Sequence, residues 1–146
     1  MNRVRLIVTI IVTFVLADAL GYFIHHIWLR QDYLPIANLL RPEGEQKVSW
    51  IIIANLAFAI GAVWAYAHGV EDKPWLGQGL RFGIVLCLIL TLPSFLILYA
   101  VLPVPAILMV KQVSSEVIGK LIIGIVIALI YGRTRLSAVL DGSKAP

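Results

Sequence analysis

Seven polar side chains interrupt the apolar stretches of this sequence at positions from which they could share one site. Asp18, Tyr22 and His25 fall within a narrow stripe of a helix that advances about 100° per residue. Glu116 lies one helical turn before Lys120. Such groups can bind an ion, relay protons or act as general acids and bases. The full set is Asp18, Tyr22, His25, Asn55, Ser94, Glu116 and Lys120.

Depth along the predicted helices brings four of these residues into one layer. At a rise of about 1.5 Å per residue, Asp18 lies about 12 Å below the outer boundary of its apolar stretch, and Lys120 about 10 Å below it. The corresponding depths are about 7 Å for Asn55 and about 12 Å for Ser94. A charge at the bilayer centre costs about 2.5–3.5 kcal/mol and therefore needs a partner. We expect Asp18 to pair with Lys120 across the bundle, with Asn55 completing the hydrogen bonding.

Three interpretations of this polar layer remain open from the sequence. In the first, Asp18 and Lys120 only hold the helices in register, while Glu116, His25 and Tyr22 contact interfacial water. In the second, the layer is a pocket for a ligand or ion. In the third, it is a path for protons from the surface to Asp18.

Two adjacent histidines raise the question of a metal site. His25 and His26 precede Glu43 and Glu45, and imidazole with carboxylate suits zinc or copper. Adjacent residues on a helix, however, point about 100° apart and rarely bind one ion. We expect no metal ion and no cofactor. The sequence also has no hydrolase elbow, phosphate-binding loop or paired cysteine motif.

The elements that must position these residues are membrane-spanning helices. The 146 residues are 60% hydrophobic and only 14% charged, with a mean hydropathy of +0.93, whereas soluble domains have about 25% charged residues. Spans of about 20 apolar residues indicate transmembrane helices. The chain is predicted to be an all-α membrane protein, an antiparallel four-helix transmembrane bundle that forms a single domain over residues 1–146. The predicted spans are 6–28, 50–67, 80–102 and 113–131, with 29–49 as an external loop.

Basic residues predict the orientation of these spans, because Lys and Arg near span ends are retained in the cytoplasm. One side has seven of them: Arg3, Arg5, Lys73, Arg81, Arg133, Arg135 and Lys144. The other side has Arg30, Arg41, Lys47 and Lys111, with Lys120 a little inside the fourth span. Both termini are therefore predicted to be cytoplasmic. The net charge of +4 fits this bias and attraction to anionic lipids, and no basic run interleaved with aromatic residues indicates nucleic-acid binding.

The external loop and the third span carry local signals. Asp32 is predicted to cap a short helix with Pro35 in its first turn and Pro42 at its end. That helix either lies on the bilayer surface or packs over the outer mouth of the bundle. Pro93 predicts a kink in the third span.

Small residues recur at spacings of four in the second and fourth spans. In a membrane such stripes let helix backbones approach closely, either inside one bundle or between subunits. The sequence leaves both uses open. The residues are Ala57, Gly61 and Ala65, then Gly124, Ala128 and Gly132.

Three segments, HHIWLRQDYLPIANLLRPEGE, EDKPWLGQGLRFG and YAVLPVPAILMVKQ, resemble those of small, uncharacterised four-span bacterial inner-membrane proteins. The resemblance implies a bacterial inner-membrane location and four spans, and it implies no activity or catalytic residue.

The sequence favours a non-enzymatic membrane protein, either an accessory subunit of a larger complex or a homo-oligomeric scaffold with an external polar pocket. Its expected partners are the lipid bilayer and a membrane protein or a second copy of the chain. The first alternative is a small transporter or channel for a proton, an ion or a small solute. The second is a membrane-embedded enzyme acting on lipid or quinone, with Asp18, Tyr22 and His25 as acid and base groups.

Overall fold

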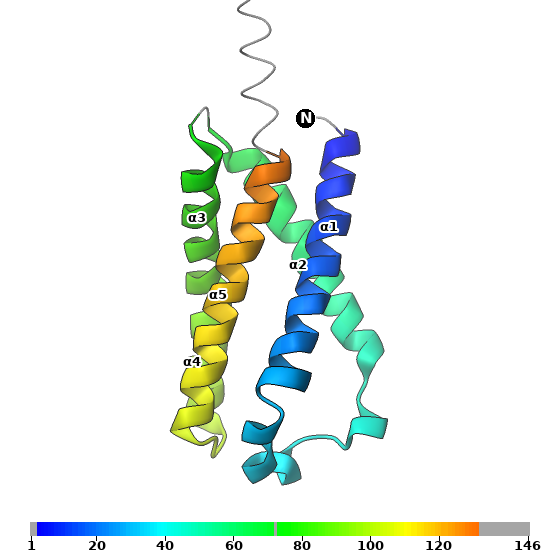
Figure 1. Cartoon of the computed structure of the whole chain (residues 1–146), viewed down its shortest axis with the longest axis vertical. Helices are drawn as coiled ribbons and strands as arrows, with labels where there is room; N and C mark the ends of the chain where they lie inside the picture. The colour runs from blue at the N-terminus through cyan, green and yellow to red at the C-terminus, as the bar shows by residue number, and fades with distance from the viewer. Residues whose placement is uncertain (1–2, 72, 132–146) are drawn as a thin grey trace, which may run out of the picture.

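Four long apolar helical segments form the bundle seen in the computed structural model of the chain (Figure 1). The structure describes residues 3–71 and 73–131. The segments are each long and apolar enough to cross a bilayer, which indicates an integral membrane protein. Their bounds are Arg3–Trp28, Val48–Gly69, Trp75–Val101 and Ala106–Tyr131.

Two of the four segments contain a π-helical stretch, a wider turn that often marks functional sites or distortions. The first segment continues from an α-helix into such a stretch, and the third has one just before Pro93, where a kink is predicted. In chain order the elements are α1 (Arg3–Tyr22), η1 (Phe23–Trp28), η2 (Gln31–Leu39), η3 (Glu43–Glu45), α2 (Val48–Gly69), α3 (Trp75–Leu86), η4 (Cys87–Thr91), α4 (Leu92–Val101) and α5 (Ala106–Tyr131).

The bundle has two distinct ends. One end carries η1, η2, η3 and the connection between α4 and α5, and we call it the loop end. The other end carries the start of α1, the connection from α2 to α3 and the end of α5, and we call it the turn end (Figure 1). Residues 3 and 131 therefore lie at the same end of the bundle.

The helix α5 begins seven residues before the predicted start of the fourth span, at Ala106 rather than at residue 113. Pro105 lies directly before it, and its carbonyl accepts a hydrogen bond from the Met109 amide at 3.1 Å. Proline is tolerated there because the first helical turn does not use its missing amide. The earlier start adds Lys111 and Gln112 to the helix.

Close contact between α3 and α5 depends on small residues from both helices. A Cβ atom added to Gly83 would lie 2.8 Å from the Leu121 Cα, and one added to Gly79 would lie 2.9 Å from the Ala128 Cβ. Gly124 on α5 faces both glycines. Gly124 and Ala128 thus serve internal packing, whereas Gly132 lies outside the described residues.

The small residues of α2 have a different environment. The helix packs mainly against α1, and Ala57, Gly61 and Ala65 are exposed. A Cβ added to Gly61 would meet nothing within 4 Å. The interpretation of this stripe as packing within the chain is therefore wrong.

The segment that joins η1 to α2 packs over the loop end of the bundle. Ile36 of η2 is buried in a cluster with Val104, Leu108 and Met109. The sequence left two placements open for this segment, on the bilayer surface or over the outer mouth of the bundle. The structure shows the second. The predicted cap is wrong, because Asp32 lies inside η2 and its carboxylate accepts a hydrogen bond from the Lys111 ammonium at 2.6 Å.

Candidate functional site

Five side chains at the loop end form one connected group, which we call the loop-end network. The Glu116 carboxylate accepts a hydrogen bond from the Lys120 ammonium at 2.6 Å and lies 3.3 Å from the His25 Nε2. On the other side of the imidazole, the His25 Nδ1 lies 2.6 Å from the Tyr33 hydroxyl oxygen. The Gln112 amide donates to the same hydroxyl at 2.7 Å. The network joins η1, η2 and α5.

With the imidazole neutral, these contacts form a consistent chain of donors and acceptors. With the proton on Nε2, which lies 3.3 Å from Glu116, Nδ1 is free to accept the Tyr33 hydroxyl proton. The Tyr33 oxygen in turn accepts from Gln112. The Gln112 Oε1 is buried and has no hydrogen-bond partner among the described residues.

The local folds of the three elements explain this convergence. Gln112, Glu116 and Lys120 recur every four residues on α5 and so lie on one face of the helix. His25 lies in the π-helical η1, and η2 places Tyr33 beside it. The sequence analysis missed Tyr33 and Gln112. The four-residue spacing on α5 was a usable signal for Gln112, but the predicted span began too late to include it.

The second polar contact is separate from the network and joins α1 to α2. The Asn55 amide donates to the Asp18 carboxylate at 2.6 Å, and both side chains are half-buried. The predicted pair between Asp18 and Lys120 is not formed. The Lys120 ammonium instead reaches back one turn to Glu116 on its own helix, a geometry that the long lysine side chain adopts easily.

Two of the predicted site residues lie away from both contacts. Tyr22 is 62% exposed and stacks on His26, with 5.1 Å between ring centroids. Ser94 is exposed on α4. The expected stripe of Asp18, Tyr22 and His25 therefore does not converge into one acid–base group. The predicted single layer is divided into a network, a pair and two outward-facing residues.

A small cavity of about 40 Å³ lies beside the network, between α1, α2 and α5. Glu116 and Lys120 form its polar wall, and the Phe58 ring, 5.3 Å from the Lys120 Nζ, forms part of its apolar wall. Water occupies about 30 Å³ in the liquid. The cavity thus has room for a water molecule or a small ion, and it is too small for an organic substrate.

Burial raises the pKa of the Tyr33 phenol above its ordinary value of 10.0. The hydrogen bond from Gln112 opposes this shift, and the negative charge of Glu116 adds to it. The hydroxyl consequently keeps its proton at neutral pH and remains a donor to His25.

The described residues bring together no three His, Cys, Asp or Glu side chains that could hold a metal ion. His26 is exposed and stacked on Tyr22.

Comparisons with protein-family models, with curated proteins and with solved structures found no match for this chain. The geometry of the chain itself must therefore carry any functional argument.

Proposed function

We propose that this protein is a small membrane scaffold, acting as an accessory subunit of a larger complex or as a homo-oligomer, with four spans and both termini in the cytoplasm. The sequence supports this orientation, because basic residues near span ends are retained in the cytoplasm. Arg3, Arg5, Lys73 and Arg81 lie at the turn end, and the sequence after α5 adds Arg133, Arg135 and Lys144, which lie outside the described residues. The resemblance to small bacterial inner-membrane proteins supports a location in the bacterial inner membrane.

The scaffold proposal depends on one observation: the polar side chains near the loop end are bonded to one another and not available for a ligand. Glu116 and Lys120 are bonded together, and Asp18 takes the amide of Asn55. The cavity beside them holds about 40 Å³. The Asp18–Asn55 pair joins α1 to α2 and so fixes the register of these two helices. The paired groups leave no room for a bound organic molecule.

A further support is the large apolar area that faces outward. In each span, at most 28% of the most hydropathic 18-residue window is buried inside the chain. Lipid covers such a surface in a monomer, and a second helical protein can cover part of it at little cost, since lipid tails are as apolar as leucine.

Native mass spectrometry of the full chain, extracted gently from its own membrane, tests this proposal. We expect a mass that contains a second protein or several copies of this chain. A monomer under conditions in which other complexes from the same membrane survive would contradict the scaffold function.

A row of polar contacts supports a second candidate, a proton pathway. From Tyr33 on η2, His25 and then Glu116 lead toward the cavity, and a hydroxyl, an imidazole and a carboxylate can each pass a proton on. Liposomes that contain the protein and a pH-sensitive dye separate the two functions. Proton flux that Glu116→Gln abolishes while the oligomer persists would favour the pathway, and equal leakage in both variants would exclude it.

A further inference from the structure

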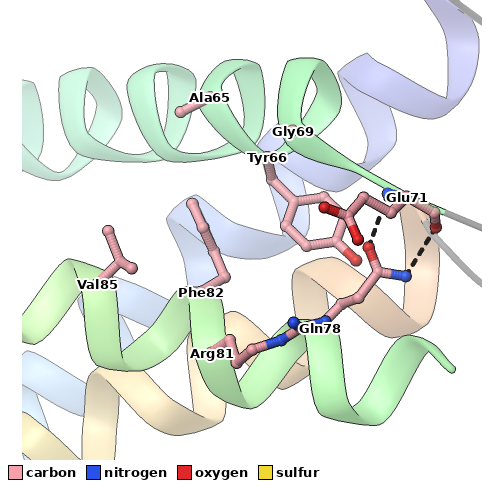
Figure 2. Close-up of a pocket in the computed structure, with 8 residues that line it drawn as sticks. All are labelled: Ala65, Tyr66, Gly69, Glu71, Gln78, Arg81, Phe82 and Val85. Carbon is pink, nitrogen blue, oxygen red and sulfur yellow. Dashed lines mark hydrogen bonds between the residues drawn. The ribbon is translucent and has the colours of Figure 1, made fainter. Parts of the chain in front are cut away.

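The turn end contains a cavity that the loop-end network does not involve. It measures about 170 Å³ and lies between α2 and α3 beneath the connection of residues 70–74 (Figure 2). Its lining residues are Ala65, Tyr66, Gly69, Glu71, Gln78, Arg81, Phe82 and Val85.

One wall of this cavity is fixed by a buried glutamine. The Gln78 side chain accepts a hydrogen bond from the Glu71 amide at 2.8 Å and donates to the Glu71 and Lys73 carbonyls at 2.8 and 2.7 Å. Figure 2 shows this side chain rising from α3 to the connection. Because these bonds use the backbone of the connection, the opening of the cavity is formed before anything binds.

The charge at the opening is positive among the described side chains. The Glu71 carboxylate is paired with the Lys73 ammonium at 2.5 Å, and this contact lowers the pKa of Glu71. Arg81 is exposed and forms no ion pair or hydrogen bond with a described residue. A guanidinium in this position is suited to a phosphate, which it binds through two parallel hydrogen bonds.

A buried hydroxyl in the same wall also lacks a partner. Tyr66 is 4% exposed, and its hydroxyl has no hydrogen-bond partner among the described residues. Figure 2 shows the ring extending from α2 toward Gln78 and Glu71. An unpaired buried donor costs free energy, which an oxygen atom entering the cavity would recover.

The remaining walls are apolar and continue toward the bundle centre. Phe82 and Val85 project from α3, and Ala65 faces them from α2 (Figure 2). One turn deeper on α2, Gly61 is open on the side of its missing Cβ. Since α2 packs mainly on α1, the exposed residues Gly61 and Ala65 leave a side of α2 on which an acyl chain can lie.

We infer that this α2–α3 cavity binds one membrane glycerophospholipid, with its phosphate on Arg81 and one acyl chain along Ala65 and Gly61. This inference rests on the membrane location in the proposed function. A partner helix fits less well, because a helix with its side chains is about 10–12 Å across and a cavity of about 170 Å³ is too small to admit one. In the proposed orientation Arg81 lies about 9 Å along α3 from Trp75, within reach of the cytoplasmic headgroups.

Native mass spectrometry of the full chain in detergent with added phosphatidylglycerol or phosphatidylethanolamine tests the site. We expect the wild-type protein to retain one phospholipid and Arg81→Gln to bind it at least tenfold more weakly. Arg81→Lys should recover part of the binding, because the charge returns without the planar fork. Lys47→Gln, which removes a positive charge from an exposed residue at the loop end, should bind as the wild type does.

Two further measurements identify the ligand. Ala65→Phe should weaken phospholipid binding by filling part of the cavity, and glycerol 3-phosphate alone should bind far more weakly than the phospholipid. Equal retention by the wild type and Arg81→Gln, equal binding of glycerol 3-phosphate, or retention of a protein in place of lipid would each overturn the inference. Recovery of the chain in the soluble fraction would instead contradict the membrane location.

Discussion

Charged side chains inside apolar helices persist only when their hydrogen-bonding capacity is used, and this chain achieves that in two ways. Asp18 is paired across a helix interface with the neutral amide of Asn55. Glu116 is paired locally with Lys120 and across an interface with His25. The loss of Asn55 leaves the Asp18 carboxylate unpaired in apolar surroundings, which costs more than the bond itself contributes.

Asn55→Leu should lower the free energy of unfolding by about 2 kcal/mol, because the Asp18 carboxylate loses its donor. Unfolding in mixed detergent micelles measures this change. The double variant Asp18→Leu/Asn55→Leu should recover most of the lost stability, since it removes the unpaired charge together with its partner. A double variant that is destabilised by the sum of the two single effects would show that the pair is not coupled.

Tyr33 should ionise above pH 10, because burial raises the pKa of its phenol from the ordinary value of 10.0. A group whose pKa is raised by folding contributes stability below its unfolded pKa, and this contribution is lost as the pH rises through the folded value. The unfolding midpoint should therefore fall more steeply above pH 10 in the wild type than in Tyr33→Phe. The difference in phenolate absorbance between the two proteins gives the Tyr33 titration directly, and a midpoint at or below 10 would contradict the prediction.

At the scale of the helices, the sequence was sufficient to predict those features that depend on one physical rule. Four apolar stretches of about 20 residues predicted the four long helices, because length and composition decide whether a helix can span a bilayer. Pro93 predicted a kink in the third span, and the structure has the π-helical η4 directly before this residue's helix, α4. Contacts that depend on helix rotation were less predictable. A fixed 100° per residue does not describe the π-helical η1, which carries His25. Tyr22, the last residue of α1, faces outward and leaves the expected stripe.

The side-chain partners in the candidate site were predictable only in part, because they too depend on how the helices are rotated. Asn55 was expected beside Asp18, and the structure places it there. The partner of Lys120 was not predictable, because its long side chain reaches both another helix and its own preceding turn. Gly79 and Gly83 were missed although their spacing of four is the pattern that identified Gly124 and Ala128.

Gly83→Ala should destabilise the bundle by about 1–3 kcal/mol, because overpacking a close contact forces backbone shifts. The new Cβ would lie 2.8 Å from the Leu121 Cα and 2.9 Å from the Lys120 carbonyl oxygen, both backbone atoms that cannot turn away. Gly61→Ala is the matched control. Its Cβ meets nothing within 4 Å, so the higher helix propensity of alanine should stabilise α2 by about 0.5–1 kcal/mol. Thermal unfolding of both variants in detergent measures the contrast, and equal effects would contradict the packing of α3 on α5.

The whole molecule is closed at one end and open at the other. At the loop end, Ile36 packs on α5 and Asp32 bonds to Lys111, so the long connection covers the helix ends. At the turn end, α2 and α3 enclose a cavity of about 170 Å³ whose opening carries Arg81. In the proposed orientation, Arg81 at this opening faces the anionic lipids of the cytoplasmic leaflet.

The orientation of the whole molecule can be tested with single cysteines. Cys87 is buried, so a membrane-impermeant maleimide should leave the wild-type chain unlabelled in intact cells. Gly44→Cys places a thiol at the exposed loop end, where a Cβ meets nothing within 4 Å, and in the proposed orientation it should be labelled in intact cells of a bacterial host once the outer barrier is permeable to the reagent. In the same orientation Lys73→Cys at the turn end should be labelled only after the host membrane is opened. The reverse pattern would invert the bundle and move Arg81 to the outer leaflet, and labelling of both sites in intact cells would contradict a membrane-spanning arrangement.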